Sequence, residues 1–106
     1  MYEGLRAWIL QLPGVKEEPH RVGGTEFQVD GLEFVHSHGE ALLDIKLSKD
    51  DQASVLRKGL ALPHRADVHA RDGWVSYRIE NSQDLAKAKR VVQLAYENAK
   101  KNPRVV

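Results

Sequence analysis

The chain has 106 residues, of which 42% are apolar and 29% are charged, and its formal net charge is +1. We expect one soluble domain, residues 1–106, because this length leaves no room for two cores and the apolar content excludes a disordered chain. No apolar run is long enough to span a membrane, no signal peptide is recognisable, and the absence of cysteine excludes disulfides and thiolate metal sites. These features predict a cytoplasmic protein without a membrane partner.

The first predicted element is a helix over Glu3–Leu12. Its apolar residues recur with helical spacing and form one stripe, made by Leu5, Trp8, Ile9 and Leu12. Pro13 and Gly14 then end the helix. Residues 15–24 contain a proline and two adjacent glycines, so we predict an irregular loop there.

Two turn signals predict a three-stranded antiparallel meander. Asp30-Gly31 is the strongest short hairpin signal, and Gly39-Glu40 also fits a two-residue turn. A two-residue turn sets which residues of the two strands lie opposite each other. The predicted strands are 25–29, 32–38 and 41–47.

The register that these turns impose predicts one apolar face and one polar face. The apolar face is made by Phe27, paired with Phe34, and by Val29, Leu32, Leu43, Ile45 and Leu47. The same register sets His36 opposite Leu43, and it places both His36 and His38 at the end of this apolar face. Asp44 falls on the opposite face, where it cannot easily join the two histidines.

A short helix and a second hairpin are predicted next. Ser48 has the features of an N-cap and Gly59 those of the residue after a helix, so the helix lies between them. The segments 66–70 and 74–79 flank Asp72-Gly73, which predicts a hairpin. Its polar side carries Trp74 and Ser76, and an indole there could stack on a ligand.

The last predicted element is a helix from its N-cap Ser82 to about Lys101, before Pro103. The order of elements is therefore α-βββ-α-ββ-α. We predict an α+β fold in which the three-stranded meander and the β-hairpin provide an antiparallel sheet, with the helices packed on one face. The sequence leaves open whether the two hairpins join in one sheet.

Histidines are the residues with the clearest chemical potential. His36 and His38 are two apart on one strand and point to the same side. This spacing can chelate a divalent metal ion, with a third ligand from His20 or His64 in neighbouring loops. A pocket for another ligand and a structural, hydrogen-bonding role are the alternatives.

Charge is divided unevenly along the chain, with a formal charge of −4 over residues 1–47 and +5 over residues 48–106. The last helix carries cations that could contact the phosphates of a nucleic acid, among them Lys87, Arg90, Lys100 and Lys101. A solvated helix face with cations near its C-terminus explains the same pattern.

Several motifs resemble those of a known family over nearly the whole chain. They are Leu12-Pro13-Gly14-Val15, Pro19-His20-Arg21 before Gly23-Gly24, the segments 34–39 and 42–47, Pro63-His64, Gly73–Ser76 and Asp84–Tyr96. Together they resemble the small luciferase domain family, whose function is unknown. The architecture is also similar to the MmcQ/YjbR-like proteins, a likeness that implies a double-wing DNA-binding fold.

The resemblance implies a site made by the motif residues that packing explains least. These candidate ligand-binding residues are His20, Arg21, His36, His38, His64, Trp74 and Ser76; the candidate metal ligands among them are His36, His38 and His64. Luciferase activity is not expected, because flavin-dependent luciferases resemble barrels of about 250 residues.

We therefore predict a binding module that takes a small polar ligand or a protein partner through a rim of histidine and tryptophan. The first alternative is a nucleic-acid-binding domain of the double-wing type. The second is an enzyme that depends on a histidine-bound metal. We predict no catalytic residue and no resident cofactor; a divalent metal ion belongs only to the second alternative.

Overall fold

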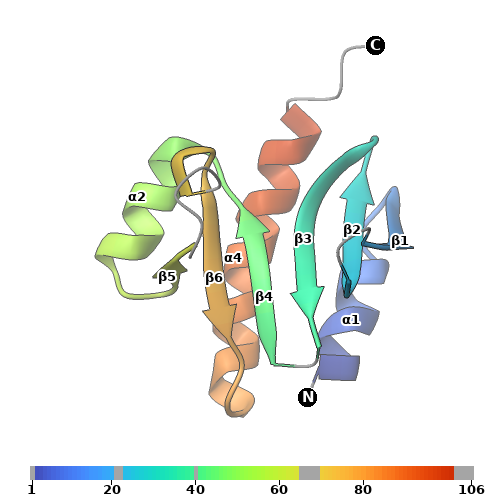
Figure 1. Ribbon diagram of the computed structural model, residues 1–106, viewed down its shortest axis with the longest axis horizontal. Helices are drawn as coiled ribbons and strands as arrows, with labels where there is room; N and C mark the ends of the chain where they lie inside the picture. The colour runs from blue at the N-terminus through green and yellow to red at the C-terminus, as the bar shows by residue number, and fades with distance from the viewer. Residues whose placement is uncertain (1, 21–22, 40, 65–69, 102–106) are drawn as a thin grey trace.

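The computed structural model describes residues 2–20, 23–39, 41–64 and 70–101, which form an α+β fold with one antiparallel sheet (Figure 1). Its elements are α1 (Tyr2–Leu10), β1 (Val15–Pro19), β2 (Thr25–Val29), β3 (Leu32–His38), β4 (Leu42–Lys46), α2 (Lys49–Arg57), β5 (Leu62–Pro63), β6 (Trp74–Arg78) and α4 (Ser82–Lys101). The six strands follow the order β1-β2-β3-β4-β6-β5, so the meander and the later strands join in one sheet.

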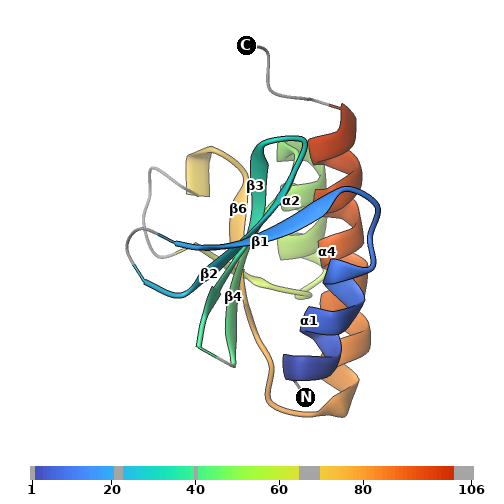
Figure 2. The same cartoon turned by 90° about the vertical axis from the view of Figure 1, so that its right-hand side faces the viewer.

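Helices α1 and α4 pack on one face of the sheet, and the core lies between them and the strands (Figure 2). The apolar stripe of α4 supplies its buried residues, which are Ala88, Val91, Val92, Ala95, Tyr96 and Ala99. We call the other side the open face. It presents Glu26, Gln28, Glu33, His36, His38, Asp44, Lys46, Trp74 and Ser76.

Local sequence signals account for several boundaries. The Ser48 hydroxyl accepts a hydrogen bond of 3.1 Å from the Asp51 amide, which confirms the predicted N-cap of α2. Helix α4 begins at Ser82 as predicted, but Asn81 provides its cap, because the Asn81 side chain accepts from the Asp84 amide at 3.1 Å. Asp30 and Gly31 have positive φ angles of 52° and 83°, as a hairpin turn of this kind requires.

The prediction of an irregular loop over 15–24 is wrong for its first half, where β1 pairs with β2. An ion pair anchors this edge strand to α1: the Arg6 guanidinium donates to both carboxylate oxygens of Glu17, at 2.6 and 2.7 Å. Pro19 ends the strand. An edge strand tolerates proline because one of its sides needs no ladder hydrogen bonds.

The register between β2 and β3 also differs from the prediction, because β3 contains a bulge. Gln28 pairs with Glu33, as the two-residue turn requires. The next pair joins Phe27 to Val35, which leaves Phe34 as an extra residue. The predicted pairing of Phe27 with Phe34 is therefore wrong. Phe34 and Val35 are both buried, and the residues after them face the opposite way from the prediction.

The bulge moves both histidines of β3 from the apolar face to the open face. Three residues connect β3 to β4, where two were predicted, so His36 pairs with Asp44 rather than with Leu43. Paired residues of antiparallel strands point to the same face. The prediction that Asp44 lies away from the histidines is wrong for this reason. The predicted core residues Phe27, Val29, Phe34, Leu43, Ile45 and Leu47 are nevertheless buried.

The second hairpin does not have the predicted partners. Strand β6 pairs with β4 on one side and with β5 on the other. Most of the predicted strand 66–70 lies outside the described residues, and Ala70 is helical. Among the described helices, none is long and apolar enough to cross a membrane.

Candidate functional site

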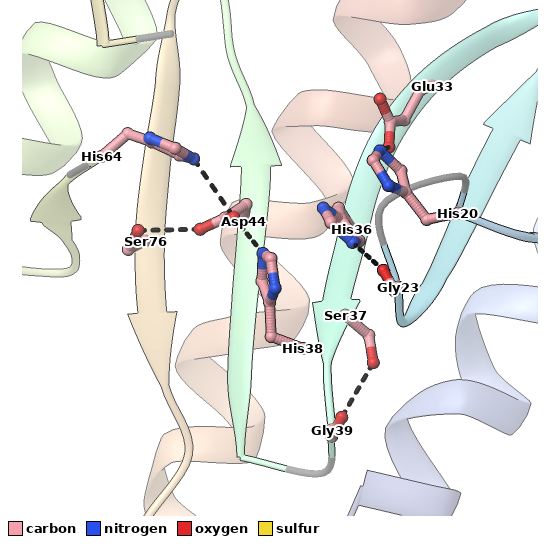
Figure 3. Close-up of polar contacts among 10 residues, drawn as sticks. All are labelled: His20, Gly23, Glu33, His36, Ser37, His38, Gly39, Asp44, His64 and Ser76. Carbon is pink, nitrogen blue, oxygen red and sulfur yellow. Dashed lines mark hydrogen bonds and ion pairs between the residues drawn. The ribbon is translucent and has the colours of Figure 1, made fainter. Parts of the chain in front are cut away.

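The candidate site lies on the open face, with Asp44 of β4 at its centre (Figure 3). Strand β4 runs between β3 and β6, so Asp44 is paired with His36 on one side and with Ser76 on the other. The three side chains form one row across the sheet. His38 extends the site along β3, and His64 reaches it from the residue after β5.

Asp44 contacts three side chains of the site. Its Oδ1 accepts a hydrogen bond of 2.8 Å from the Ser76 hydroxyl. Its Oδ2 lies 2.5 Å from Nε2 of His38 and 3.1 Å from Nε2 of His64. Burial is the largest influence on the pKa of Asp44 and raises it, but the contacts with Ser76, His38 and His64 together outweigh burial. The net pKa is lowered, so this buried carboxyl group is an anion near neutral pH.

His36 is held by the loop that follows β1. Its Nε2 lies 2.9 Å from the carbonyl oxygen of Gly23. A carbonyl oxygen can only accept, so Nε2 carries the hydrogen and Nδ1 keeps its lone pair. Burial lowers the pKa of His36 and the Gly23 contact opposes this, with the net shift downwards. The ring is therefore neutral near pH 7.

His20 joins the site from the end of β1. Its ring stacks on that of His36, with the centroids 3.7 Å apart and the planes 14° from parallel. Its Nε2 lies 3.3 Å from a carboxylate oxygen of Glu33. His20 therefore links the histidines to the polar residues at the other end of the open face.

A groove of about 500 Å³ occupies that other end of the open face. Gln28, Glu33 and Lys46 line its floor, and it extends from His20 on the β1 side to Trp74 on β6. The Trp74 ring also meets the His64 ring edge to face, at a centroid distance of 6.5 Å. The groove and the histidines are thus parts of one continuous surface.

The structure brings together six of the seven predicted candidate residues; these are His20, His36, His38, His64, Trp74 and Ser76. Arg21 lies outside the described residues. Glu33 was not among the predicted site residues, and Asp44 was expected to lie away from the histidines. Two adjacent large apolar residues, Phe34 and Val35, are the signal that could have revealed the bulge and hence the position of Asp44.

The arrangement offers two sets of donor atoms for a metal ion. In the described residues, His36, His38 and Asp44 form one set and His20, Glu33 and His36 form the other, each with its donor atoms within 4.8 Å of one another. The predicted set was His36, His38 and His64. In the structure, Asp44 takes the place of His64 as the third member of the set. Imidazole and carboxylate groups also suit hydrogen bonding to a polar ligand.

The cations of α4 belong to the other side of the molecule. Helix α4 packs on the face of the sheet opposite the histidines, behind the strands in Figure 3. Lys87, Arg90 and Lys101 are exposed, and Lys100 lies 3.3 Å from a carboxylate oxygen of Asp30. Nucleic-acid binding through this helix stays a prediction.

A comparison with protein families finds a match to the family described as Luciferase domain over residues 31–95. The chain belongs to the luciferase domain family. The matched segment runs from the start of β3 into α4. It contains every residue around Asp44 named above, whereas His20 precedes it. No curated protein matches the sequence, and the likeness to MmcQ/YjbR-like proteins stays a prediction.

Proposed function

We propose that this luciferase domain is a binding module, and that the open face is where it takes a small polar ligand. The observation that carries the proposal is the convergence of His20, His36, His38, His64 and Trp74 on one surface beside a groove. Packing does not require these side chains there, because the core lies on the other side of the sheet.

The groove supports a small molecule rather than a protein segment as the occupant. Its volume of about 500 Å³ falls within the range of small-molecule sites, roughly 300–1,000 Å³. Gln28, Glu33 and Lys46 offer donors and acceptors on its floor. Trp74 lines one end of the groove, and an indole suits a ligand with a planar or sugar-like part.

Nuclear magnetic resonance of the labelled chain tests this proposal. The probes are nucleosides, sugars, amino acids and aromatic carboxylates, added singly. We expect at least one of them to shift the Trp74 indole resonance and those of the neighbouring histidines. The chain has one further tryptophan, Trp8 of α1, which packs against the core and has Lys89 over its ring at 5.8 Å. Its indole resonance is an internal control and should not move.

Variants separate binding from folding. We expect Trp74→Ala to lose the probe-induced shifts of the histidines, and the double variant His36→Ala/His38→Ala to lose that of the Trp74 indole, each with a modest loss of stability. A large loss of stability without a binding defect would indicate that the histidines are structural. Probe-induced shifts confined to helix α4, at Ala95, Asn98 and Ala99, would contradict the proposal.

A further inference from the structure

We propose that the histidine end of the open face binds one divalent first-row transition-metal ion, with His36, His38 and Asp44 as its protein ligands. This inference rests on the proposed function, because it names a ligand for part of the same surface. The ligands predicted from the sequence were His36, His38 and His64. The third ligand proposed here is the Asp44 carboxylate, because the bulge in β3 places the histidines beside it.

The spacing of the donor atoms suits such an ion. Nε2 of His38 and Oδ2 of Asp44 are 2.5 Å apart, and one nitrogen of His36 lies within 4.8 Å of both donor atoms. Ligands at their usual distance from zinc, about 2.0–2.1 Å, are about 3.3 Å from one another in a tetrahedral site. Small side-chain movements are therefore enough to admit the ion.

Neighbouring groups already orient two of the three ligands. The Gly23 carbonyl occupies Nε2 of His36, which leaves Nδ1 as the nitrogen able to bind a metal. The Ser76 hydroxyl occupies Oδ1 of Asp44, which leaves Oδ2 toward His38 and His64. Metal-binding histidines and carboxylates commonly have such partners on their second polar atom.

The alternative set of His20, Glu33 and His36 is less suitable because of its ring geometry. The lone pair of an imidazole nitrogen lies in the plane of the ring. The rings of His20 and His36 are stacked only 14° from parallel, so their planes do not meet nearby. The rings of His36 and His38 are tilted by 46° at a centroid distance of 3.9 Å, which lets their nitrogens converge.

The chemistry of the donors defines the class of ion. Two imidazoles and one carboxylate favour iron, cobalt, nickel or zinc, whereas magnesium and calcium prefer oxygen ligands alone. The His38 side chain is 34% exposed, so solvent reaches this side of the cluster. With three protein ligands, the metal keeps at least one open coordination position, which water or part of a small molecule bound in the groove can fill.

The first test is a titration of the chain, without a histidine tag and after dialysis against a chelator, with Co²⁺. We expect visible absorption bands of a cobalt–imidazole complex that saturate at one ion per chain. Zn²⁺ should displace the cobalt, and Mg²⁺ at the same concentration should not. The inference would be overturned if Co²⁺ showed no saturable binding, or if Mg²⁺ displaced the bound cobalt as well as Zn²⁺ does.

Three substitutions locate the ion. His38→Gln and Asp44→Asn should each weaken Co²⁺ binding by about 100-fold or more, whereas His20→Gln, which removes a ligand of the alternative set, should leave it close to wild type. If Asp44→Asn fails to fold, the partly exposed His38 still decides the outcome. Loss of binding in His20→Gln with retention in His38→Gln would place the ion in the alternative set and contradict our assignment.

The same samples distinguish this inference from the proposed function. If Co²⁺ does not bind but organic probes still shift the Trp74 resonance, the metal site is wrong and the binding module remains. If neither the ion nor any probe perturbs the open face, both are wrong.

Discussion

At the scale of single residues, Gly24 shows how the backbone positions the site. Its φ angle of +79° lies in the region that favours glycine. A Cβ atom there would lie 2.2 Å from the carbonyl oxygen of Ser37 and 3.2 Å from Nε2 of His36. The absence of a side chain thus lets the loop after β1 pack on β3, where Gly23 contacts His36.

Gly24→Ala should therefore destabilise the protein more than Gly23→Ala. Gly23 also has a positive φ, of +103°, but a Cβ atom added to it would have no atom of the described residues within 4 Å. The Gly23 variant should lose about 1 kcal/mol from backbone strain alone, and the Gly24 variant about 2–3 kcal/mol because the clash adds to the strain. Urea unfolding measures both values, and equal losses would refute the role of the close approach.

At the scale of elements, β1 depends on its ion pair with α1. The hydrogen bond from Arg6 is the main reason why the pKa of Glu17 lies below its usual value of 4.5. Because the folded-state pKa is lower than the unfolded one, the pair stabilises the folded state above that value. This stabilisation is lost as the pH falls through the lowered pKa.

Glu17→Gln should consequently lower the free energy of unfolding at about pH 7, and this effect should shrink as the pH falls below about 4. Unfolding by urea at several pH values gives the comparison. The matched control is Glu18→Gln, which changes the next, exposed residue of the same strand and should leave stability almost unchanged at all of these pH values. A Glu17 effect that is independent of pH would speak against the ion pair.

At the scale of the whole molecule, Tyr96 ties the last helix to the start of the chain. Its hydroxyl donates a hydrogen bond of 2.6 Å to the carbonyl oxygen of Pro13, 83 residues away in sequence. Its ring meets that of Phe34 edge to face, at a centroid distance of 5.9 Å. One side chain therefore connects α4, the bulge in β3 and the turn before β1.

Substitutions of Tyr96 should have graded effects on stability. Tyr96→Phe removes only the hydroxyl and should cost about 1 kcal/mol. Tyr96→Leu also removes the ring contact and should cost about 2 kcal/mol or more in total. Thermal unfolding followed by calorimetry gives both values. Identical melting temperatures for wild type and Tyr96→Phe would mean that the long-range hydrogen bond adds nothing.

Much of the fold follows from signals that act within a few residues. The turn at Asp30-Gly31, the cap at Ser48 and the apolar stripe of the last helix are each predictable, because their energies come from near neighbours in sequence. The α+β class and most of the core follow from these elements. The candidate residues on the open face could be chosen from their types and motifs, but their arrangement could not.

Long-range packing sets the arrangement of the site. A shift of one residue in register turns every later side chain to the other face of a sheet. In β3 this shift occurs because Phe34 and Val35 are both buried in the core, and it carries His36 and His38 to Asp44. The adjacent apolar residues Phe34 and Val35 permit this bulge but do not require it, because the sequence around the histidines is compatible with the unbulged register as well. Only the packing of distant elements, α4 above all, selects the one that assembles the site.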